Sequence, residues 1–426
     1  MNTHDNKKTR ESEYNTCNPD SGSFLFNGTE VTFNPAVVTP PPLQEKLYPI
    51  VSLALDVSGT CNMHCIYCAE SSTMPKRQPM STDILKKAIK SLFEWSHFLS
   101  LSIHVGSGEP FLQPDLVHLI GTYTRALQKR EQEREQEKNQ HPREVSLHIT
   151  TNGTLLTEKM YDWLLHDKWT IKVSLDGPAF IHDRNRKNKD GEGTFKKIKP
   201  AIDYLCHVPG FSTTSVLCHN TDPAEVFYGI AALNVKKIEL VPVASKDSHL
   251  TLTEEDIEKY RQFILGYAKK IAQNESLPRL TRFVKKVQRV MGYGTTRIPC
   301  GAGRTFIATG PEGILYPCFR FIGIEKYELG HIDTGIDEEK VMHFAAHTGH
   351  PYNQRNTCNT CWAAPLCGGP CFACADLIYD NNGEPAPDYC EMVRADCEAA
   401  VWLVNTLNKK HPEILLDFLG VSLEDV

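Results

Sequence analysis

Three cysteines are crowded into one short stretch of the chain, with the spacing Cys61-x3-Cys65-x2-Cys68. Thiolates are soft ligands that suit iron–sulfur clusters and zinc. The spacing lets three thiolates converge from one loop, and three ligands on a four-iron cube leave one iron open. An open coordination position is what a catalytic metal site requires, whereas structural sites are usually closed. The alternative interpretation is a zinc site completed by His64 or by a distant residue.

Further cysteines recur in the C-terminal part of the chain, where glycine and proline are also frequent. Their order is Cys300-x12-Gly313-x4-Cys318, then Cys358-x2-Cys361-x5-Cys367-x3-Cys371, then Cys390. Weak periodicity, few apolar residues and many thiols predict a region that metal binding holds together. A zinc ribbon at Cys358 and Cys361 is disfavoured because so many other cysteines accompany this pair.

The elements that must position the first cysteines are strands that alternate with helical patterns. Strand-like runs lie at residues 50–55, 101–105, 145–149, 170–175, 213–217 and 237–241. This alternation predicts an α/β fold with a parallel sheet, either open or closed into a partial barrel. Cys61 follows the first of these strands, and α/β folds place their ligands at the carboxyl ends of strands.

Helices and one hairpin complete the expected elements. Helices are predicted at 84–93 behind a Ser81 cap, within 130–143 as a solvated extension, at 253–272, at 391–407 and after Pro412. Phe24 to Phe33 reads as a small hairpin around Asn27-Gly28. Residues 1–22 are polar and are expected to be disordered.

Composition limits the possible partners and compartments. The chain has 426 residues, 41% of them hydrophobic and 23% charged, with a net charge of -6. This mildly acidic balance gives no support for a nucleic-acid partner. No apolar run approaches the ~18–20 residues needed to span a bilayer, and the polar start does not resemble a secretory signal. We therefore expect a cytoplasmic protein, in which 15 reduced cysteines are better read as metal ligands than as disulfides.

The first cysteine motif, with Tyr67 before its last cysteine, resembles the signature of the radical S-adenosylmethionine (radical SAM) superfamily. The resemblance covers roughly residues 48–245 and implies a partial (β/α)6 barrel. Cys61, Cys65 and Cys68 would then hold a [4Fe–4S] cluster that binds S-adenosylmethionine. Gly106-Ser107-Gly108-Glu109-Pro110 resembles the family's Gly-Gly-Glu-Pro segment, which hydrogen-bonds the methionyl amino group, although Ser107 departs from the commoner glycine.

Further segments resemble this family at the ends of the third and fourth strands. Asn152 lies in Thr151-Asn152-Gly153-Thr154, and Ser174 and Asp176 lie in Ser174-Leu175-Asp176-Gly177. The corresponding family segments lie near the ribose and the carboxylate of S-adenosylmethionine. Arg186 is expected to pair with that carboxylate.

The C-terminal cysteines resemble the SPASM domain, which carries two auxiliary [4Fe–4S] clusters and is expected to have little regular structure. By position, Cys300, Cys318 and Cys371 would hold the first auxiliary cluster. Cys358, Cys361, Cys367 and Cys390 would hold the second. The first set has only three thiolates: Cys374 or Cys397 could complete it, or one iron could stay open. Cys17, Cys206 and Cys218 are expected to be unligated.

These features divide the chain into five expected units. They are a tail with the small hairpin (1–47), the radical SAM partial barrel (48–245), a helical linker (246–295), the SPASM domain (296–400) and a C-terminal helical segment (401–426).

The resemblance implies an oxidoreductase that generates a 5′-deoxyadenosyl radical and modifies a peptide. We favour side-chain crosslinking of a ribosomally made precursor peptide, with a flavodoxin- or ferredoxin-type electron donor. One alternative is an oxidase of the sulfatase-maturating type. In such enzymes Asp typically follows the second cysteine of the C-terminal domain, whereas this chain has Phe319. The other alternative is a non-catalytic iron–sulfur electron carrier or scaffold, which would need no turn such as Gly106–Pro110 for a methionyl ammonium.

Overall fold

The computed structural model describes residues 23–26, 29–32, 50–68, 77–98, 100–137, 143–294, 297–379, 384–408 and 410–420. The predicted disordered tail at 1–22, with Cys17, lies outside these ranges. The small hairpin is confirmed: β1 (Ser23–Phe26) and β2 (Thr29–Thr32) pair antiparallel, with Phe26 opposite Thr29. This register leaves only Asn27 and Gly28 between the strands, as the Asn-Gly signal requires.

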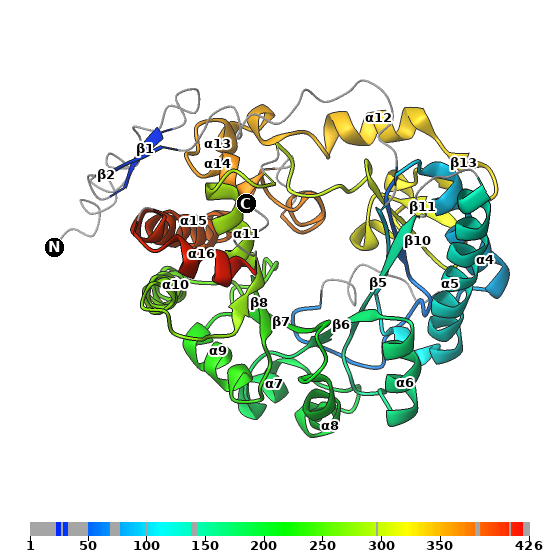
Figure 1. Cartoon of the computed structure of the whole chain (residues 1–426), viewed down its shortest axis with the longest axis horizontal. Coiled ribbons are helices and arrows are strands. Elements are labelled where there is room, and N and C mark those ends of the chain that lie inside the picture. Colours follow the sequence, from blue (N-terminus) through cyan, green and yellow to red (C-terminus); the bar gives the residue numbers. More distant parts are fainter. Residues whose placement is uncertain are drawn as a thin grey trace.

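Six parallel strands form the centre of the molecule, in the order in which they occur along the chain. All six strands predicted from the sequence are confirmed, with small differences at their ends. They are β3 (Ser52–Leu55), β4 (Ser100–Val105), β5 (Glu144–Thr151), β6 (Trp169–Ser174), β7 (Phe211–Leu217) and β8 (Lys237–Pro242). The sheet is curved, as expected for a partial barrel (Figure 1).

Helices connect the strands and cover the outside of the curved sheet (Figure 1). They are α4 (Thr82–Trp95), α5 (Pro114–Glu137), α6 (Glu158–His166), α7 (Ala179–Asn185), α8 (Phe195–Leu205) and α9 (Pro223–Ala231). The Ser81 hydroxyl caps α4 by accepting a hydrogen bond from the Ile84 amide at 3.2 Å. The predicted extension within 130–143 is helical up to Glu137.

The two faces of the central strands differ in burial. Along β6 the buried residues Ile171 and Val173 alternate with the half-buried Thr170, Lys172 and Ser174. β4 alternates in the same way. Parallel sheets normally have both faces covered by apolar packing. The polar, half-buried inner face therefore marks an accessible lumen inside the partial barrel.

The sheet continues beyond the barrel strands into the cysteine-rich region. β9 (Arg279–Leu280) pairs parallel with β8 at one end, and β10 (Phe306–Thr309) pairs parallel with β3 at the other. β11 (Ile314–Tyr316), β12 (Gly330–His331) and β13 (Gly335–Ile336) then add antiparallel. These short strands were not predicted, because two to four residues carry no detectable alternation.

Helices surround the rest of the cysteine-rich region and pack it against the barrel. They are α10 (Glu254–Ala272), α11 (Thr281–Val290), α12 (Glu338–His347), α13 (Asn356–Asn359), α14 (Ala364–Cys367), α15 (Pro387–Leu407) and α16 (Pro412–Leu419). Helical turns also span Pro110–Leu112, Phe319–Phe321, Glu325–Tyr327, Tyr352–Gln354 and Cys374–Ile378, the last of them a π-helix. α15 packs against α10, and the Tyr260 hydroxyl donates a 2.6 Å hydrogen bond to Asp396 between them. Among the helices that the structure describes, none has the length and apolar character needed to cross a membrane.

Candidate functional site

The loop that carries Cys61, Cys65 and Cys68 leaves the end of β3 and runs beside the segment that follows α7. The His64 amide donates to the Lys187 carbonyl at 2.8 Å, and the Ile66 amide donates to the Asn185 carbonyl at 3.0 Å. These backbone hydrogen bonds fix the course of the loop, so that its three thiols lie at the carboxyl end of the barrel.

The three thiols are half-buried and influence one another electrostatically. Burial, and to a smaller extent the nearby Glu109, Cys65 and Cys68, raise the pKa of Cys61 to about 11. Thiols in such surroundings need a bound cation to become thiolates. Among the described residues, no three His, Cys, Asp or Glu side chains converge on a single ion.

A tight turn links the predicted Gly106–Pro110 segment to the cysteine loop. Ser107 and Gly108 both have left-handed backbone, with φ of 67° and 56°. A Cβ at Gly108 would lie 2.1 Å from the Thr60 carbonyl oxygen. The Glu109 amide donates to the same carbonyl at 2.9 Å. Only glycine fits this close approach, which sets the turn directly against the residue that precedes Cys61.

Glu109 is fully buried, and its carboxylate already accepts three hydrogen bonds from the chain. The donors are the Phe111 amide at 3.0 Å, the Thr151 hydroxyl at 2.6 Å and the Asn152 amide at 2.7 Å. Burial raises the pKa of Glu109, against the opposing effect of these hydrogen bonds. In this arrangement Glu109 joins the ends of β4 and β5 and orients the turn.

Asn152 connects the end of β5 to the cysteine loop. Its side-chain nitrogen Nδ2 donates to Asn62 Oδ1 at 2.8 Å and lies 3.9 Å from Cys61 Sγ. Asn62 in turn donates to the Thr154 hydroxyl at 2.9 Å. The predicted residues Cys61, Glu109 and Asn152 are thus brought into one network.

Tyr67, Asp176 and Arg186 form a buried polar group beneath Cys65. The Tyr67 hydroxyl donates to Asp176 Oδ2 at 2.7 Å and accepts from Arg186 Nη1. Arg186 also pairs with Asp176 at 3.9 Å, and only 8% of its surface is exposed. Its Nε is buried without a hydrogen-bond partner among the described residues. A buried donor without a partner is uncommon in proteins and suits an anionic ligand group such as a carboxylate.

His182 contacts the backbone of Asp176 and links this group to Thr194. It accepts weakly from the Asp176 amide, at 3.4 Å, and its Nε2 lies 3.1 Å from the Thr194 hydroxyl. Burial, followed by the charge of Arg186, lowers the pKa of His182 to about 3, so the ring is neutral. Ser174 is half-buried at the end of β6, two residues before Asp176.

The four cysteines predicted for the second auxiliary cluster line one small apolar cavity. They are Cys358 on α13, Cys361 in the loop after it, Cys367 at the end of α14 and Cys390 in the first turn of α15. Four soft ligands around one cavity match the donor set of a cluster with four cysteines. α15 begins before the predicted Glu391, so Cys390 lies on this helix.

Cys300, Cys318 and Cys371, predicted for the first auxiliary cluster, also lie near one another. Burial, and then the charge of Cys371 and that of Cys300, raise the pKa of Cys318 to about 12. Cys300 precedes β10, Cys318 follows β11 and Cys371 opens the turn before Cys374. The structure therefore joins three segments that are far apart in the sequence.

The inner face of the barrel carries residues that sequence reasoning missed. His104 and His148, paired across β4 and β5, stack with ring centroids 4.6 Å apart. Lys172 and Glu239 form a 2.7 Å ion pair across the lumen strands β6 and β8. In the sequence these residues are the polar positions of alternating strands. Which polar residues meet becomes known only when the strands are placed side by side in the barrel.

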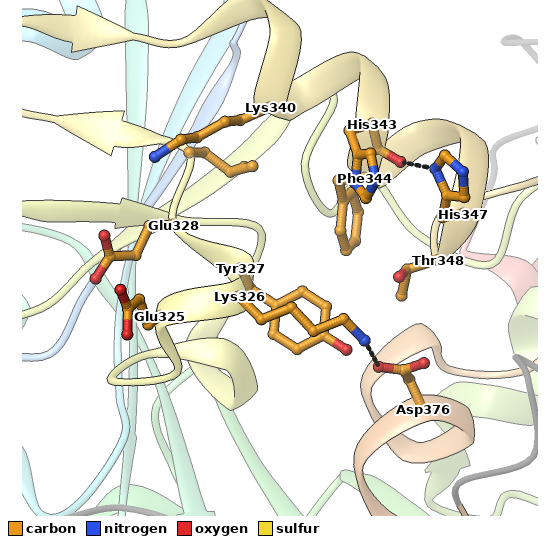
Figure 2. A pocket seen from close by; sticks show the side chains of 11 residues that line it. Glu325, Lys326, Tyr327, Glu328, Lys340, His343, Phe344, His347, Thr348 and Asp376 are labelled. Atoms are coloured by element: carbon orange, nitrogen blue, oxygen red, sulfur yellow. Dashed lines mark hydrogen bonds and ion pairs between the residues drawn. The ribbon is translucent and has the colours of Figure 1, made fainter.

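A cavity of about 350 Å³ continues from the lumen toward the auxiliary cysteines. Glu239 and Val241 line it at the barrel end, and Cys371 and Cys374 line it at the other end. Its lining residues include five basic ones, Arg282, Lys285, Lys286, Arg289 and Arg320. A second cavity, of about 320 Å³, is lined by residues of α12 and of the Glu325–Tyr327 turn and has no cysteine among its described lining residues (Figure 2).

Comparison with known proteins agrees with this geometry. Residues 55–227 match the family model of the radical SAM superfamily. A serine-type anaerobic sulfatase-maturating enzyme of Bacteroides thetaiotaomicron is 30% identical over 38% of this chain, which spans only 37% of that relative. A cysteine-type enzyme of Clostridium perfringens is 23% identical over 84% of this chain and 99% of the relative.

Among solved structures, native anSMEcpe with bound AdoMet and the Cp18Cys peptide has a TM-score of 0.70 at 22% identity. The match covers 85% of this chain and 99% of that one, so the two proteins share a fold. The α/β fold class is thereby confirmed. A radical SAM domain implies a [4Fe–4S] cluster that binds S-adenosylmethionine. Residues 55–227 of this chain match the radical SAM superfamily model and form such a domain, within a fold that the solved structures share.

Proposed function

We propose that this chain is a peptide-modifying radical SAM enzyme that crosslinks side chains of a ribosomally made precursor peptide. The observation that carries the proposal is the convergence of Cys61, Glu109, Asn152 and Arg186 at one end of an accessible lumen. Electron carriers and scaffolds do not need the buried Nε donor of Arg186, which has no hydrogen-bond partner among the described residues.

Each group of residues has a distinct role in this proposal. Cys61, Cys65 and Cys68 hold the cluster, and Arg186 donates to the carboxylate of S-adenosylmethionine from its Nε, which has no partner among the described residues. When bound and reduced, the cluster supplies the electron that cleaves S-adenosylmethionine to a 5′-deoxyadenosyl radical. Gly106, Ser107, Gly108 and Pro110 shape the turn that faces the methionyl amino group, with Glu109 as its anchor. Asn152, Ser174 and Asp176 border the ribose and carboxylate.

The substrate is proposed to enter through the lumen and the adjoining cavity. The cavity runs from Glu239, at the barrel end, to Cys371, so a peptide in it would reach the auxiliary cysteines. The lumen supplies hydrogen-bonding groups on β4, β5 and β6 that can orient the peptide before a hydrogen atom is removed.

Crosslinking is favoured over sulfatase maturation because of Phe319. This aromatic ring lies against Gly106, within 3.4 Å of the position that a Cβ there would take, and packs on Phe306 with ring centroids 6.4 Å apart. The position that typically carries an aspartate base in sulfatase-maturating enzymes is therefore apolar. The relatives with sulfatase-maturating names nevertheless make that activity the second candidate.

The proposal also includes two auxiliary [4Fe–4S] clusters and an external electron donor of the flavodoxin or ferredoxin type. Cys300, Cys318 and Cys371 contribute to the first auxiliary cluster, and Cys358, Cys361, Cys367 and Cys390 hold the second. Their convergence around separate sites supports this division. Both would exchange electrons with the substrate or with the donor.

Mass spectrometry after anaerobic co-expression tests the function. The full chain is produced with each short peptide encoded beside its gene and, separately, with a peptide that carries a sulfatase-type Cys or Ser motif. We expect a neighbouring peptide to lose two hydrogens per modification and to gain a crosslink in its fragment spectrum. The Cys65→Ala variant serves as the inactive control. If only the peptide with the sulfatase-type motif were modified, the chain would be assigned to sulfatase maturation instead of crosslinking.

A further inference from the structure

The first auxiliary set has three assigned cysteines, and two other thiols could complete it. Cys374 lies three residues after Cys371, and Cys397 lies on α15. The difference matters for function, because a cluster with three protein ligands can bind substrate through its fourth iron. A cluster with four protein ligands can only exchange electrons.

Cys374 shares a helical turn with Cys371. The Ala375 amide donates to the Cys371 carbonyl at 3.0 Å, so the turn that leads into the π-helix Cys374–Ile378 starts at Cys371. Residues three apart on a helical turn project to the same side. The two thiols hydrogen-bond to each other and line the same cavity as Arg320. π-helical turns of this kind are frequent at functional sites.

The far side of this turn is tied to a different part of the molecule. Asp376, two residues after Cys374, accepts an ion pair from Lys326 at 3.6 Å, at the wall of the α12 cavity (Figure 2). Residues two apart on a helix do not face each other. The ion pair therefore helps to hold the turn in the orientation that directs Cys374 toward Cys371 and the cavity.

The spacing of Cys371 and Cys374 repeats a pattern that the chain uses elsewhere. Cys65 and Cys68 are separated by two residues, and so are Cys358 and Cys361. Both of these pairs belong to assigned cluster sets. Two cysteines at this spacing commonly ligate the same iron–sulfur cluster.

Cys397 lies on the opposite side, beside the second auxiliary set. Its side chain is fully buried, and its neighbours include Lys286, Cys361 and Cys367. That set already has four cysteines around its own cavity. The structure thus separates the two candidate thiols, one to each auxiliary site.

We propose that Cys374 is the fourth protein ligand of the first auxiliary cluster, so that this cluster has no iron open to substrate. The inference rests on the proposed auxiliary clusters and defines the role of one of them. Arg320, which follows Cys318 and lies near both Cys371 and Cys374, offsets part of the negative charge that a fourth thiolate adds. The substrate peptide is then held by side chains of the lumen and cavity, not by auxiliary iron.

Iron content and spectra of anaerobically reconstituted variants test this assignment. Wild type should hold about 12 irons, four for each of three clusters. Cys374→Ala should lose up to about four of them, or keep them with an electron paramagnetic resonance spectrum that changes when 2-mercaptoethanol is added. Cys374→Ser, which keeps an oxygen ligand, should retain the iron with a shifted spectrum. All spectra are taken with S-adenosylmethionine present, so that it occupies the open iron of the Cys61, Cys65 and Cys68 cluster. Under these conditions the wild-type spectrum should not respond to 2-mercaptoethanol.

Two cysteine variants serve as matched controls. Cys206 is buried at the end of α8, where its thiol donates to the Asp203 carbonyl at 3.3 Å, and Cys397 is the rejected candidate. Both alanine variants should keep the wild-type iron content and the first auxiliary cluster's spectrum. Wild-type iron content and spectrum in Cys374→Ala, or loss of the first auxiliary cluster in Cys397→Ala, would overturn the assignment of Cys374 as the fourth ligand but not the auxiliary clusters themselves. Wild type with only about four irons would overturn it together with the auxiliary clusters.

Discussion

At the scale of single residues, the candidate site depends on a few positions where only one side chain fits. Gly108 is one, because its φ of 56° coincides with a contact that leaves no room for a Cβ. Tyr67 is another, because its hydroxyl bridges Asp176 and Arg186. Both residues lie within or beside the motifs that the sequence identified. Their contacts, however, are with residues far away in the sequence: Thr60 for Gly108, and Asp176 and Arg186 for Tyr67.

Replacing Gly108 by alanine should disrupt the turn and weaken S-adenosylmethionine binding. The Cβ would clash with the Thr60 carbonyl, and left-handed backbone disfavours alanine, so we expect a loss of at least about 1 kcal/mol in unfolding free energy. Equilibrium binding and chemical unfolding measure the two effects. Gly266→Ala is the control, because nothing lies within 4 Å of its added Cβ. Equal effects of the two substitutions would contradict the role of the turn.

Tyr67→Phe should leave the cluster in place but loosen Arg186. Removal of the hydroxyl takes one hydrogen bond from Asp176 and one from Arg186, at a cost of about 1–3 kcal/mol. We expect the KM for S-adenosylmethionine to rise more than kcat falls, with unchanged iron content. Tyr293→Phe, on a side chain that is 55% exposed, is the matched control. Loss of iron without a change in KM would assign Tyr67 to cluster binding instead.

At the scale of elements, the strands decide which polar residues meet. The sequence predicted all six barrel strands because their buried faces are regular, and the family motifs located Cys61, Glu109, Asn152 and Asp176. It did not predict the lumen pair His104 and His148, since their contact depends on the register between β4 and β5. Interstrand register is set by packing over the whole sheet and not by local pattern.

The half-buried His104 should make the barrel acid-sensitive. Burial, then His148 and Lys172, lower its pKa from 6.5 to about 4. Its ring also faces Ser102 and Phe306, neither of which carries a charge. Between these two pKa values the unfolded chain binds a proton that the folded chain does not, so the free energy of unfolding falls as pH falls through this window.

Urea unfolding of the holoenzyme at about pH 7.5 and about pH 5.5 measures this effect. The loss of stability toward acid should be smaller for His104→Gln than for wild type. His249→Gln, at an exposed histidine, should keep the wild-type slope. An identical pH slope in wild type and His104→Gln would show that His104 takes up its proton equally in the folded and unfolded chains.

At the scale of the whole molecule, the clusters are expected to add to the hydrophobic core in holding the short segments of the cysteine-rich region together. Cys358, Cys367 and Cys390 come from three separate helices, α13, α14 and α15, that meet around one cavity. In the sequence this region showed only its cysteine spacing, because its helices are as short as four residues. Metal ligation over long sequence separations contributes directly to folding in such regions.

Loss of the second auxiliary cluster should therefore destabilise the C-terminal region more than the barrel. We expect Cys358→Ala to lower solubility and to expose residues around α13 and α14 to limited proteolysis, while β3 to β8 stay protected. Hydrogen exchange followed by mass spectrometry gives the regional comparison. Cys206→Ala, a buried thiol outside both cluster sets, should behave like wild type. If Cys358→Ala had the wild-type hydrogen-exchange protection in every region, the second auxiliary cluster would not stabilise the C-terminal region.

The central claim is that Cys61, Cys65 and Cys68 hold a cluster that cleaves S-adenosylmethionine. The most direct measurement is 5′-deoxyadenosine formation by anaerobically reconstituted protein with S-adenosylmethionine and dithionite. Wild type should form 5′-deoxyadenosine, and Cys65→Ala should form none while keeping its fold. Full 5′-deoxyadenosine formation by Cys65→Ala, or none by an iron-loaded wild type, would contradict the account.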